Sequence, residues 1–226
     1  MFLASGGGGT MQFIYYALQQ LNVGVSICGV VADRNCRALH FAQQKNIEYK
    51  IVGYTQQQPQ AFREAITYFQ PDIIITTFHK LIDAATLHQF KHIIFINPHY
   101  SILPAFKGSV GMKTVEKARE LNCGFVGASA HHVIAESDAG KIISQAILPI
   151  ANWNEVDMKL LKDTIFKSTC LVLLNAIIMQ LDITLLSSIT TKTYSLNSHE
   201  VIVSPDKLHQ LANYNDWQTE FGKISF

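Results

Sequence analysis

Short, uninterrupted apolar runs alternate with helical patterns through the first hundred residues of the chain. The runs indicate strands because they are rich in apolar and β-branched residues. Residues 2–4, 73–77 and 93–96 are runs of this kind, and two further strands that include polar residues are predicted over 23–31 and 47–52. The segments with helical apolar spacing comprise residues 11–21, 36–45 and 62–69. Strands that are apolar on both faces and alternate with helices predict a parallel sheet that helices cover on both sides.

The pattern changes after Pro104. Residues 114–120 and 156–181 have helical character, and the second segment contains an apolar stretch too short to span a membrane. Two β-type stretches, 124–133 and 141–150, flank a polar turn and therefore predict an antiparallel pair of strands. The fold class we predict is α/β and Rossmann-like, with a mostly parallel sheet flanked by helices and an antiparallel strand pair in the second half.

Length and charge limit the domain organisation and the partners. A chain of 226 residues can bury one sizeable core, so we expect a single α/β domain over residues 1–182 and a C-terminal extension of unknown role over 183–226. The formal net charge is only +1, which argues against nucleic acid or an acidic membrane as a partner. No basic segment followed by a long apolar run marks a signal peptide, so we expect a soluble, cytoplasmic protein.

Four cysteines are scattered along the chain, at positions 28, 36, 123 and 170. None pairs with another cysteine or with a histidine at the spacing typical of zinc sites. We therefore expect reduced thiols and no bound metal.

Four successive glycines, beginning at Gly6, lie between the first strand and the first helix. Glycine lets the backbone approach a ligand closely, and a helix N-terminus offers free N–H groups to an anion. The turn therefore suggests a phosphate or carboxylate site, although a tight connection without a ligand fits the pattern equally well. The residues that would bind the anion are Gly7, Gly8, Gly9 and Thr10. Thr10 is expected either to cap the helix or to bind the anion, and capping is the simpler interpretation.

A second polar cluster follows the apolar run at residues 93–96. Asn97 and His99 lie at the end of this strand, where open parallel sheets bind their ligands. Pro98 lies between them, where we expect it to break the strand and to fix one backbone angle. An asparagine amide can donate to a carbonyl oxygen, and a histidine can exchange a proton near neutral pH. The alternative interpretation is an ordinary Asn-Pro turn with an exposed histidine.

A third polar group lies on the turn between the two antiparallel strands. Asp138 lies on this turn, and His131 precedes it by seven residues, near the end of a strand. A carboxylate on a turn is commonly solvated, and a single histidine on a strand face is an ambiguous signal. Each residue is unremarkable by itself, and only the order and spacing of the whole set indicate a catalytic centre.

Taken together, these segments resemble the folate-dependent formyltransferase family, and most closely its purine-biosynthesis branch. The glycine turn matches the family's first loop in outline. Segment 97–104 matches its Asn-x-His run that ends in Leu-Pro, and His131 with Asp138 matches its second motif. Residues 71–82 also resemble the family's fourth strand and the loop after it. The resemblance covers residues 1 to 150.

The resemblance implies transfer of a formyl group from the co-substrate 10-formyltetrahydrofolate to a primary amine. A phosphorylated acceptor such as glycinamide ribonucleotide is the first candidate. Asn97 would bind the formyl oxygen, His99 would stabilise the oxyanion and help to transfer protons, and Asp138 would hold the protonated form of His99 and order a water. The residues expected to contact the folate are Phe78, His79, Lys80, Leu81, Ile82, His131, Ala135, Glu136 and Ser137.

The chain departs from the family's purine branch mainly on the acceptor side. Pro98 precedes the histidine, whereas the proline of that branch follows it. Residues 108–112 lack the two histidines found there, and residues 167–170 lack its acidic residue. Because unpaired buried polar groups are costly, a changed acceptor site indicates a changed acceptor.

Two alternatives therefore stand beside the first candidate. One is a formyltransferase for another amine, such as an amino-sugar nucleotide or an amino acid derivative. The other is a non-catalytic module that binds folate or a nucleotide and has kept the fold. Retention of all three polar residues argues against the module. The partners are small molecules in every case, and the sequence leaves open whether the chain forms a homodimer.

Overall fold

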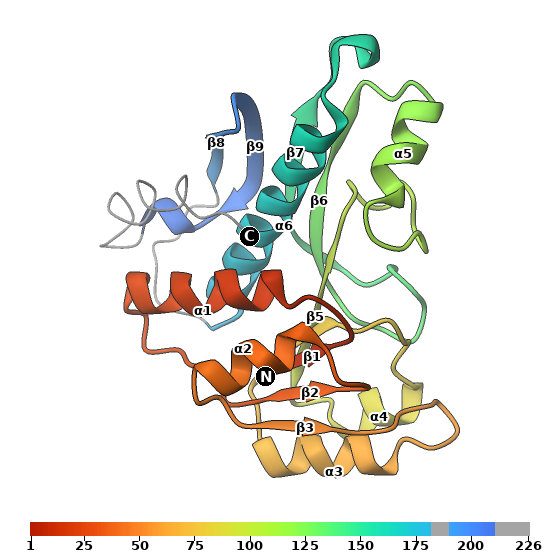
Figure 1. Ribbon diagram of the computed structural model, residues 1–226, viewed down its shortest axis with the longest axis vertical. Helices are drawn as coiled ribbons and strands as arrows, with labels where there is room; N and C mark the ends of the chain where they lie inside the picture. The colour runs from red at the N-terminus through yellow and green to blue at the C-terminus, as the bar shows by residue number, and fades with distance from the viewer. Residues whose placement is uncertain (182–189, 211–226) are drawn as a thin grey trace.

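The computed structural model describes residues 1–181 and 190–210, which form a nine-stranded sheet with helices on both faces (Figure 1). The strands are β1 Phe2–Ala4, β2 Val30–Ala32, β3 Tyr49–Ile51, β4 Ile73–Thr77, β5 Ile94–His99, β6 Phe125–His132, β7 Ile142–Pro149, β8 Thr190–Leu196 and β9 His199–Asp206. The helices are α1 Gly9–Leu21, α2 Arg37–Gln44, α3 Gln60–Phe69, α4 Ala84–Gln89, α5 Lys113–Glu120 and α6 Met158–Gln180. Two single turns of 3-10 helix are η1 Trp153–Glu155 and η2 Leu208–Gln210.

The strand order is β3-β2-β1-β4-β5-β6-β7-β9-β8. The first five strands of this order, β3-β2-β1-β4-β5, pair in parallel. Every pair after β5 in the order is antiparallel. Strand β5 is therefore the boundary, because it is parallel to β4 and antiparallel to β6. The predicted fold class is confirmed, and the antiparallel part contains the hairpin β8–β9 in addition to the predicted pair.

The second strand is shorter than its apolar pattern predicts. We expected a strand over residues 23–31, but residues 23–29 form no strand and β2 begins at Val30. Asn22 ends α1 in the left-handed region, with φ 51°, and the chain turns back towards the sheet over the following residues. Apolar side chains in this return segment pack against the core without pairing in the sheet.

Strand β5 does not break at Pro98, so that expectation is wrong. The Val133 N–H donates to the carbonyl of Phe95, and hydrogen-bonded residues alternate along an antiparallel pair. The backbone N–H and C=O groups of residues 95, 97 and 99 therefore point to β6. The backbone of Pro98 points to the side of β4. Pairing with β4 ends at Ile96, so no neighbouring strand needs the N–H group that proline lacks.

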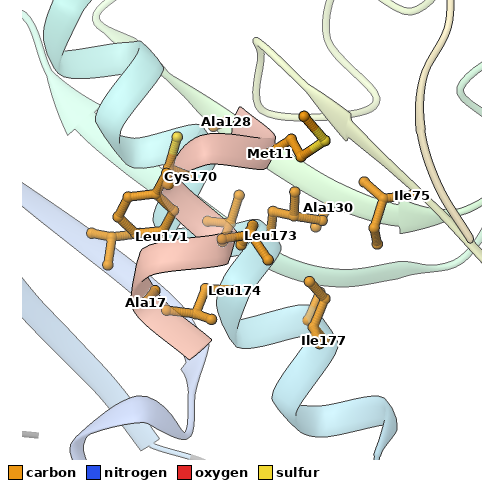
Figure 2. Packing of buried hydrophobic residues seen from close by; sticks show 14 of the residues in the cluster. Met11, Ala17, Ile75, Ala128, Ala130, Cys170, Leu171, Leu173, Leu174 and Ile177 are labelled. Atoms are coloured by element: carbon orange, nitrogen blue, oxygen red, sulfur yellow. The ribbon is translucent and has the colours of Figure 1, made fainter. Parts of the chain in front are cut away.

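The apolar core lies in two layers, one on each face of the sheet. Helices α1, α2 and α6 cover one face, and α3 with the segment around α4 covers the other. Figure 2 shows side chains of α1 and α6 meeting over the sheet, where β6 contributes the small residues Ala128 and Ala130. Small residues on the strand let α6 approach closely. Residues 168–178 of that helix are consequently buried on all sides.

The C-terminal hairpin joins the same sheet. Strand β9 pairs with β7, and the fully buried Asn175 of α6 fixes both strands. Its amide nitrogen donates to Ser144 of β7 at 2.9 Å, and its oxygen accepts from the Lys207 N–H at 2.7 Å. Residues 190–210 of the predicted extension are thus packed on the α/β domain, and the rest of that extension lies outside the described residues.

Within the described part of the chain, no helix is both long and apolar enough to cross a membrane. The four cysteines form no disulfide.

Candidate active site

A cavity of about 550 Å³ lies at the edge of the sheet where β1, β4 and β5 end. Four segments contribute most of its wall: the glycine turn before α1, the loop after β4, the end of β5, and the turn between β6 and β7. Residues 108–111 and Phe166 of α6 complete it. Carboxyl ends of parallel strands are where open α/β sheets bind ligands, so this cavity is the candidate site.

Asn97 extends from β5 with both ends of its amide in contact with protein. Its Oδ1 accepts a hydrogen bond from the Thr76 hydroxyl at 3.0 Å, and its Nδ2 lies 3.2 Å from Nε2 of His131. An amide nitrogen carries two protons. One proton is directed to His131, so the second is available to an oxygen atom of a ligand in the cavity.

His99 lines the same cavity and is only 6 % exposed. Its Nδ1 lies 3.6 Å from Oδ1 of Asp138, and the ring also hydrogen-bonds to the backbone of Phe106. Its Nε2 is buried and has no hydrogen-bond partner among the residues that the structure describes. An unpaired buried polar atom costs roughly 1–3 kcal/mol, which a hydrogen-bonding ligand would recover.

The protonation of His99 reflects opposing influences. Burial lowers the pKa of this imidazole from its ordinary value, the carboxylate of Asp138 raises it, and the neighbouring His131 lowers it further. The net result is a lowered pKa, so the ring is mainly neutral at pH 7. A neutral histidine of this kind can accept a proton from a reacting group.

Asp138 lies between two imidazoles. Its Oδ1 is 3.6 Å from Nδ1 of His99 and 3.5 Å from Nε2 of His131, while its Oδ2 accepts from the Gly108 N–H at 2.8 Å. Burial alone would raise the pKa of this carboxyl, but its contacts with His131 and His99 and the Gly108 N–H lower it to about 2. The group is therefore a fixed negative charge at physiological pH.

The turn between β6 and β7 places this carboxylate. Asp138 has a left-handed φ of 50°, which aspartate tolerates better than most residues. Two residues later, a Cβ on Gly140 would fall 1.6 Å from the carbonyl oxygen of His132. Only glycine permits so close an approach, so the Asp-Ala-Gly sequence closes the two strands with the carboxylate facing His99.

The glycine turn forms the opposite side of the cavity. Gly8 has a left-handed φ of 75°, and a Cβ at this position would lie 2.8 Å from the Cα of Ala38. The prediction that Thr10 caps the helix is wrong, because Gly8 is the N-cap and no side chain caps α1. Thr10 is the second residue of α1, and its hydroxyl bonds to that of Tyr100. The N–H groups of the first helical turn therefore have no side-chain cap.

Tyr100 connects the two sides. It follows His99 directly, lines the cavity, and bonds to Thr10 of α1. Burial raises the pKa of Tyr100 to about 12, so the ring remains a neutral phenol at all relevant pH values. The residue after the catalytic histidine candidate thus connects the end of β5 to the first turn of α1.

The loop after β4 offers the cavity mainly backbone. The Phe78 ring packs on Tyr54 with ring centroids 5.7 Å apart, and Lys80 Nζ donates to the Tyr54 carbonyl at 2.7 Å. The His79 N–H is bound to the Ser5 hydroxyl at 3.1 Å. Leu81, which is about half exposed, is the apolar side chain that this loop leaves at the rim.

The structure brings nearly all of the predicted site residues to one cavity. The residues that line it as expected are Asn97, His99, Asp138, Gly7, Gly8, Gly9, Thr10, Phe78, His79, Lys80, Leu81, Ile82, His131, Glu136 and Ser137. Ala135 is the exception, because it does not line the cavity although its neighbours do.

Sequence reasoning missed several lining residues. They include Thr76, Thr77, Tyr100, Val110, Val133, Ile134 and Phe166. Val133 and Ile134 lie between His131 and the predicted folate segment, so proximity in sequence could have identified them. Phe166 lies on α6, 67 residues after the end of β5, and only the packing of α6 on the sheet brings it to the glycine turn.

No group of three or more His, Cys, Asp or Glu side chains within residues 1–181 and 190–210 is placed to hold a metal ion. The polar groups of the cavity instead include the imidazoles of His99 and His131, the amide of Asn97 and the partly buried carboxylate of Asp138. Such a set can donate hydrogen bonds to a carbonyl oxygen and transfer protons while a nucleophile attacks the carbonyl carbon.

Comparison with known proteins points to one family. The model of the family described as Formyl transferase matches residues 1–174. The chain is 26% identical over 155 residues to the chloroplastic phosphoribosylglycinamide formyltransferase of Vigna unguiculata, which covers 65% of this chain and 49% of that protein. It is 28% identical over 121 residues to a formyltetrahydrofolate deformylase of Synechocystis sp. This match covers 51% of the present chain and 41% of that protein.

A solved structure shares the fold. The phosphoribosylglycinamide formyltransferase of Bacillus halodurans superposes with a TM-score of 0.71 and 19% sequence identity, covering 80% of this chain and 94% of that one. The present chain spans about half the length of the first curated relatives that it matches.

Proposed function

Because the chain belongs to the formyl transferase family, we propose that it transfers the formyl group of 10-formyltetrahydrofolate to a primary amine. The observation that carries the proposal is the connected set of Asn97, His99 and Asp138 in the wall of the cavity. These three residues are the proposed catalytic centre.

Asn97 would act on the formyl oxygen. Attack by an amine moves negative charge onto this oxygen. The second amide proton of Asn97 would donate to it, because the first is already directed to His131. A donor of this kind typically contributes about 2.7–4 kcal/mol of transition-state stabilisation. The amide needs little reorganisation, because Thr76 holds its other end.

His99 would carry the proton. The ring starts neutral with its Nδ1 3.6 Å from Asp138, so the unpaired Nε2 can accept the proton that the amine loses. Once protonated, the ring donates from Nε2, and the carboxylate of Asp138 stabilises the positive charge. The same proton can then pass to the nitrogen that leaves the formyl carbon.

The co-substrate supplies the formyl group on a nitrogen that becomes the leaving group. The residues present fit a bound folate, since the 550 Å³ cavity is within the usual range for such ligands. Backbone of residues 78–82 would hold the pterin, together with His131, Glu136 and Ser137. Exposed apolar side chains of Leu81, Val110 and Ile134 at the rim would contact its aromatic part.

The acceptor we favour is a phosphorylated amine such as glycinamide ribonucleotide. Similarity to phosphoribosylglycinamide formyltransferases supports this choice, and the glycine turn offers the phosphate a helix N-terminus. A second candidate is hydrolysis of the formyl donor, in which water replaces the amine. It is favoured by the similarity to formyltetrahydrofolate deformylases.

One assay distinguishes these candidates. The protein is incubated with 10-formyltetrahydrofolate alone and with glycinamide ribonucleotide, an amino-sugar nucleotide or an amino acid amide, and the folate absorbance is followed. Turnover only with glycinamide ribonucleotide supports the first candidate. Turnover with another amine reassigns the acceptor, and formate release without an amine supports hydrolysis. Folate binding without any turnover would contradict an enzymatic role.

A further inference from the structure

Three polar side chains stand in one row across the antiparallel part of the sheet. His99 of β5 pairs with Ser129 of β6, and Ser129 pairs with Gln145 of β7. Residues that lie opposite each other on neighbouring strands have their side chains on the same face of a sheet. Ala128 and Ala130 pack under α6, so the row lies on the face of the sheet opposite this helix.

The segment that follows β5 folds back over this row. The fully buried hydroxyl of Ser129 donates to the Ser101 carbonyl at 2.7 Å and accepts from the Leu103 N–H at 2.9 Å. The amide nitrogen of Gln145 donates to the Leu103 carbonyl at 2.9 Å and to the Ser129 hydroxyl at 3.0 Å. Both backbone polar groups of Leu103 are thus bonded to side chains of β6 and β7.

The same loop reaches the proposed catalytic residues a few positions later. Phe106 has a left-handed φ of 59°, a conformation that a phenylalanine seldom adopts unless the surrounding structure holds it. Its backbone bonds to the ring of His99. Two residues later, the Gly108 N–H donates to Oδ2 of Asp138 at 2.8 Å. Loop 101–108 therefore holds both members of the imidazole–carboxylate pair, and the row of side chains on the sheet holds the loop.

The contact with Phe106 determines which nitrogen of His99 carries the proton. The contact raises the pKa of the ring, which identifies the backbone group as an accepting carbonyl. Because Nε2 has no partner among the described residues, Nδ1 makes this contact. A carbonyl can only accept, so the proton of the neutral ring lies on Nδ1 and leaves Nε2 free to act as a base. A histidine in the wrong tautomer can lose most of its catalytic effect.

We propose that Ser129 and Gln145 are positioning residues, which hold loop 101–108 on the sheet and thereby keep the proton of His99 on Nδ1. Neither side chain lines the cavity, so both act on the substrates only through His99 and Asp138. Their effect on the reaction rate rests on the proposed function, whereas their effect on the protonation of His99 does not.

Nitrogen NMR of protein with isotope-labelled histidine distinguishes protonated from unprotonated ring nitrogens, and the spectrum of His99→Ala identifies the signals of this ring. In the native protein, we expect the proton on Nδ1. Gln145→Met keeps the size of the side chain but loses both donors, so part of His99 should become protonated at Nε2. The kcat should then fall about tenfold, while the KM of each substrate stays within about twofold of native. Ser129→Ala should change both readouts in the same direction.

Ser144→Ala is the matched control. Ser144 is the residue before Gln145 on β7, faces the opposite side of the sheet, and is also fully buried. Its hydroxyl accepts from Asn175 and donates to the Pro205 carbonyl, so the variant loses two hydrogen bonds of the same strand. Its melting temperature should fall, but the protonation of His99 and kcat should remain native.

Three results would overturn the proposal: a proton on Nε2 of His99 in the native protein, native protonation in both Gln145→Met and Ser129→Ala, or an equal change of protonation in Ser144→Ala. Native turnover in a variant whose His99 has changed protonation defeats this inference and spares the proposed function. Protonation of His99 that depends on Gln145, without turnover of any amine by the native protein, does the reverse.

Discussion

The two sides of the cavity hold their polar groups in different ways. On the side of β5 and β6, side chains hold one another: Asn97, His131, Asp138 and His99 form a chain with successive separations of 3.2, 3.5 and 3.6 Å. On the side of the glycine turn, the polar groups are backbone N–H groups at the start of α1, and Arg37 lies beside them.

This difference separates the reaction from the choice of substrate. In a chain of mutually bonded side chains, loss of one member leaves its buried neighbour unpaired, so each member constrains the others. A backbone site constrains sequence mainly where glycine is required, and the residues around it are free to change. The side-chain network should therefore determine the chemistry, and the glycine turn with its surroundings should determine the acceptor.

Replacing His99 with alanine should have the largest effect on the network side. The variant loses both the proton acceptor and a donor to the oxyanion, so kcat/KM should fall about 10³-fold or more. Steady-state assays with the best acceptor measure this. His40→Ala, an exposed histidine on α2, is the control and should retain native activity. Activity of His99→Ala within tenfold of native would show that another group carries the proton.

Replacing Asn97 with alanine should have a somewhat smaller effect. It removes one donor to the formyl oxygen, which corresponds to a loss of about 10²–10³ in kcat. The KM of the acceptor should change little, because the amide lies away from the glycine turn. Steady-state kinetics with each substrate varied in turn test this. An increase in KM at constant kcat would instead assign Asn97 to ground-state binding.

Replacing Asp138 with asparagine tests whether this carboxylate influences the pKa of His99. The carboxylate raises the pKa of His99, so its removal should lower that pKa further. The acid limb of the kcat profile should therefore move to lower pH, with a loss of about tenfold or more in the maximum rate. NMR titration of the His99 ring measures the shift directly. Glu136→Gln, at an exposed carboxylate paired with Lys107, should leave the pKa of His99 unchanged.

Replacing Gly8 with alanine tests the backbone side and should have the smallest effect on the reaction. Its left-handed φ and the contact with Ala38 should lower the free energy of unfolding by about 1–3 kcal/mol. The KM of the acceptor should rise while kcat is nearly unchanged. Gly6→Ala is the matched control, since a Cβ there meets nothing within 4 Å. Urea unfolding compares the two variants, and equal stabilities would show that the turn tolerates a side chain.

The sequence was sufficient to predict the parallel half of the sheet and the residues of the network. Uninterrupted apolar runs locate β1, β4 and β5 because both faces of a central strand are buried. It did not predict that β5 continues through Pro98. The strand can continue because the N–H group that Pro98 lacks would face β4, whose pairing with β5 has already ended. The sequence of β5 alone does not reveal which strand lies on that side.

The acceptor side was harder to predict from the sequence, because contacts between segments far apart in the chain shape it. Phe166 and Arg37 reach the glycine turn only through the packing of α6 and α2, which the sequence pattern does not indicate. Thr10 was expected to cap α1 from its residue type, but the left-handed conformation of Gly8 starts the helix two residues earlier. Local propensity could not anticipate a turn whose shape depends on contact with α2.

The position of β5 has a consequence for how such an enzyme can diversify. Both Asn97 and His99 lie on a strand that is bonded to β4 before them and to β6 alongside them, so they can move only with the centre of the sheet. The loops opposite are attached at their ends and can accept substitutions independently. Proteins with this sheet can therefore change their amine acceptor through substitutions in the loops, while the positions of Asn97 and His99 stay the same.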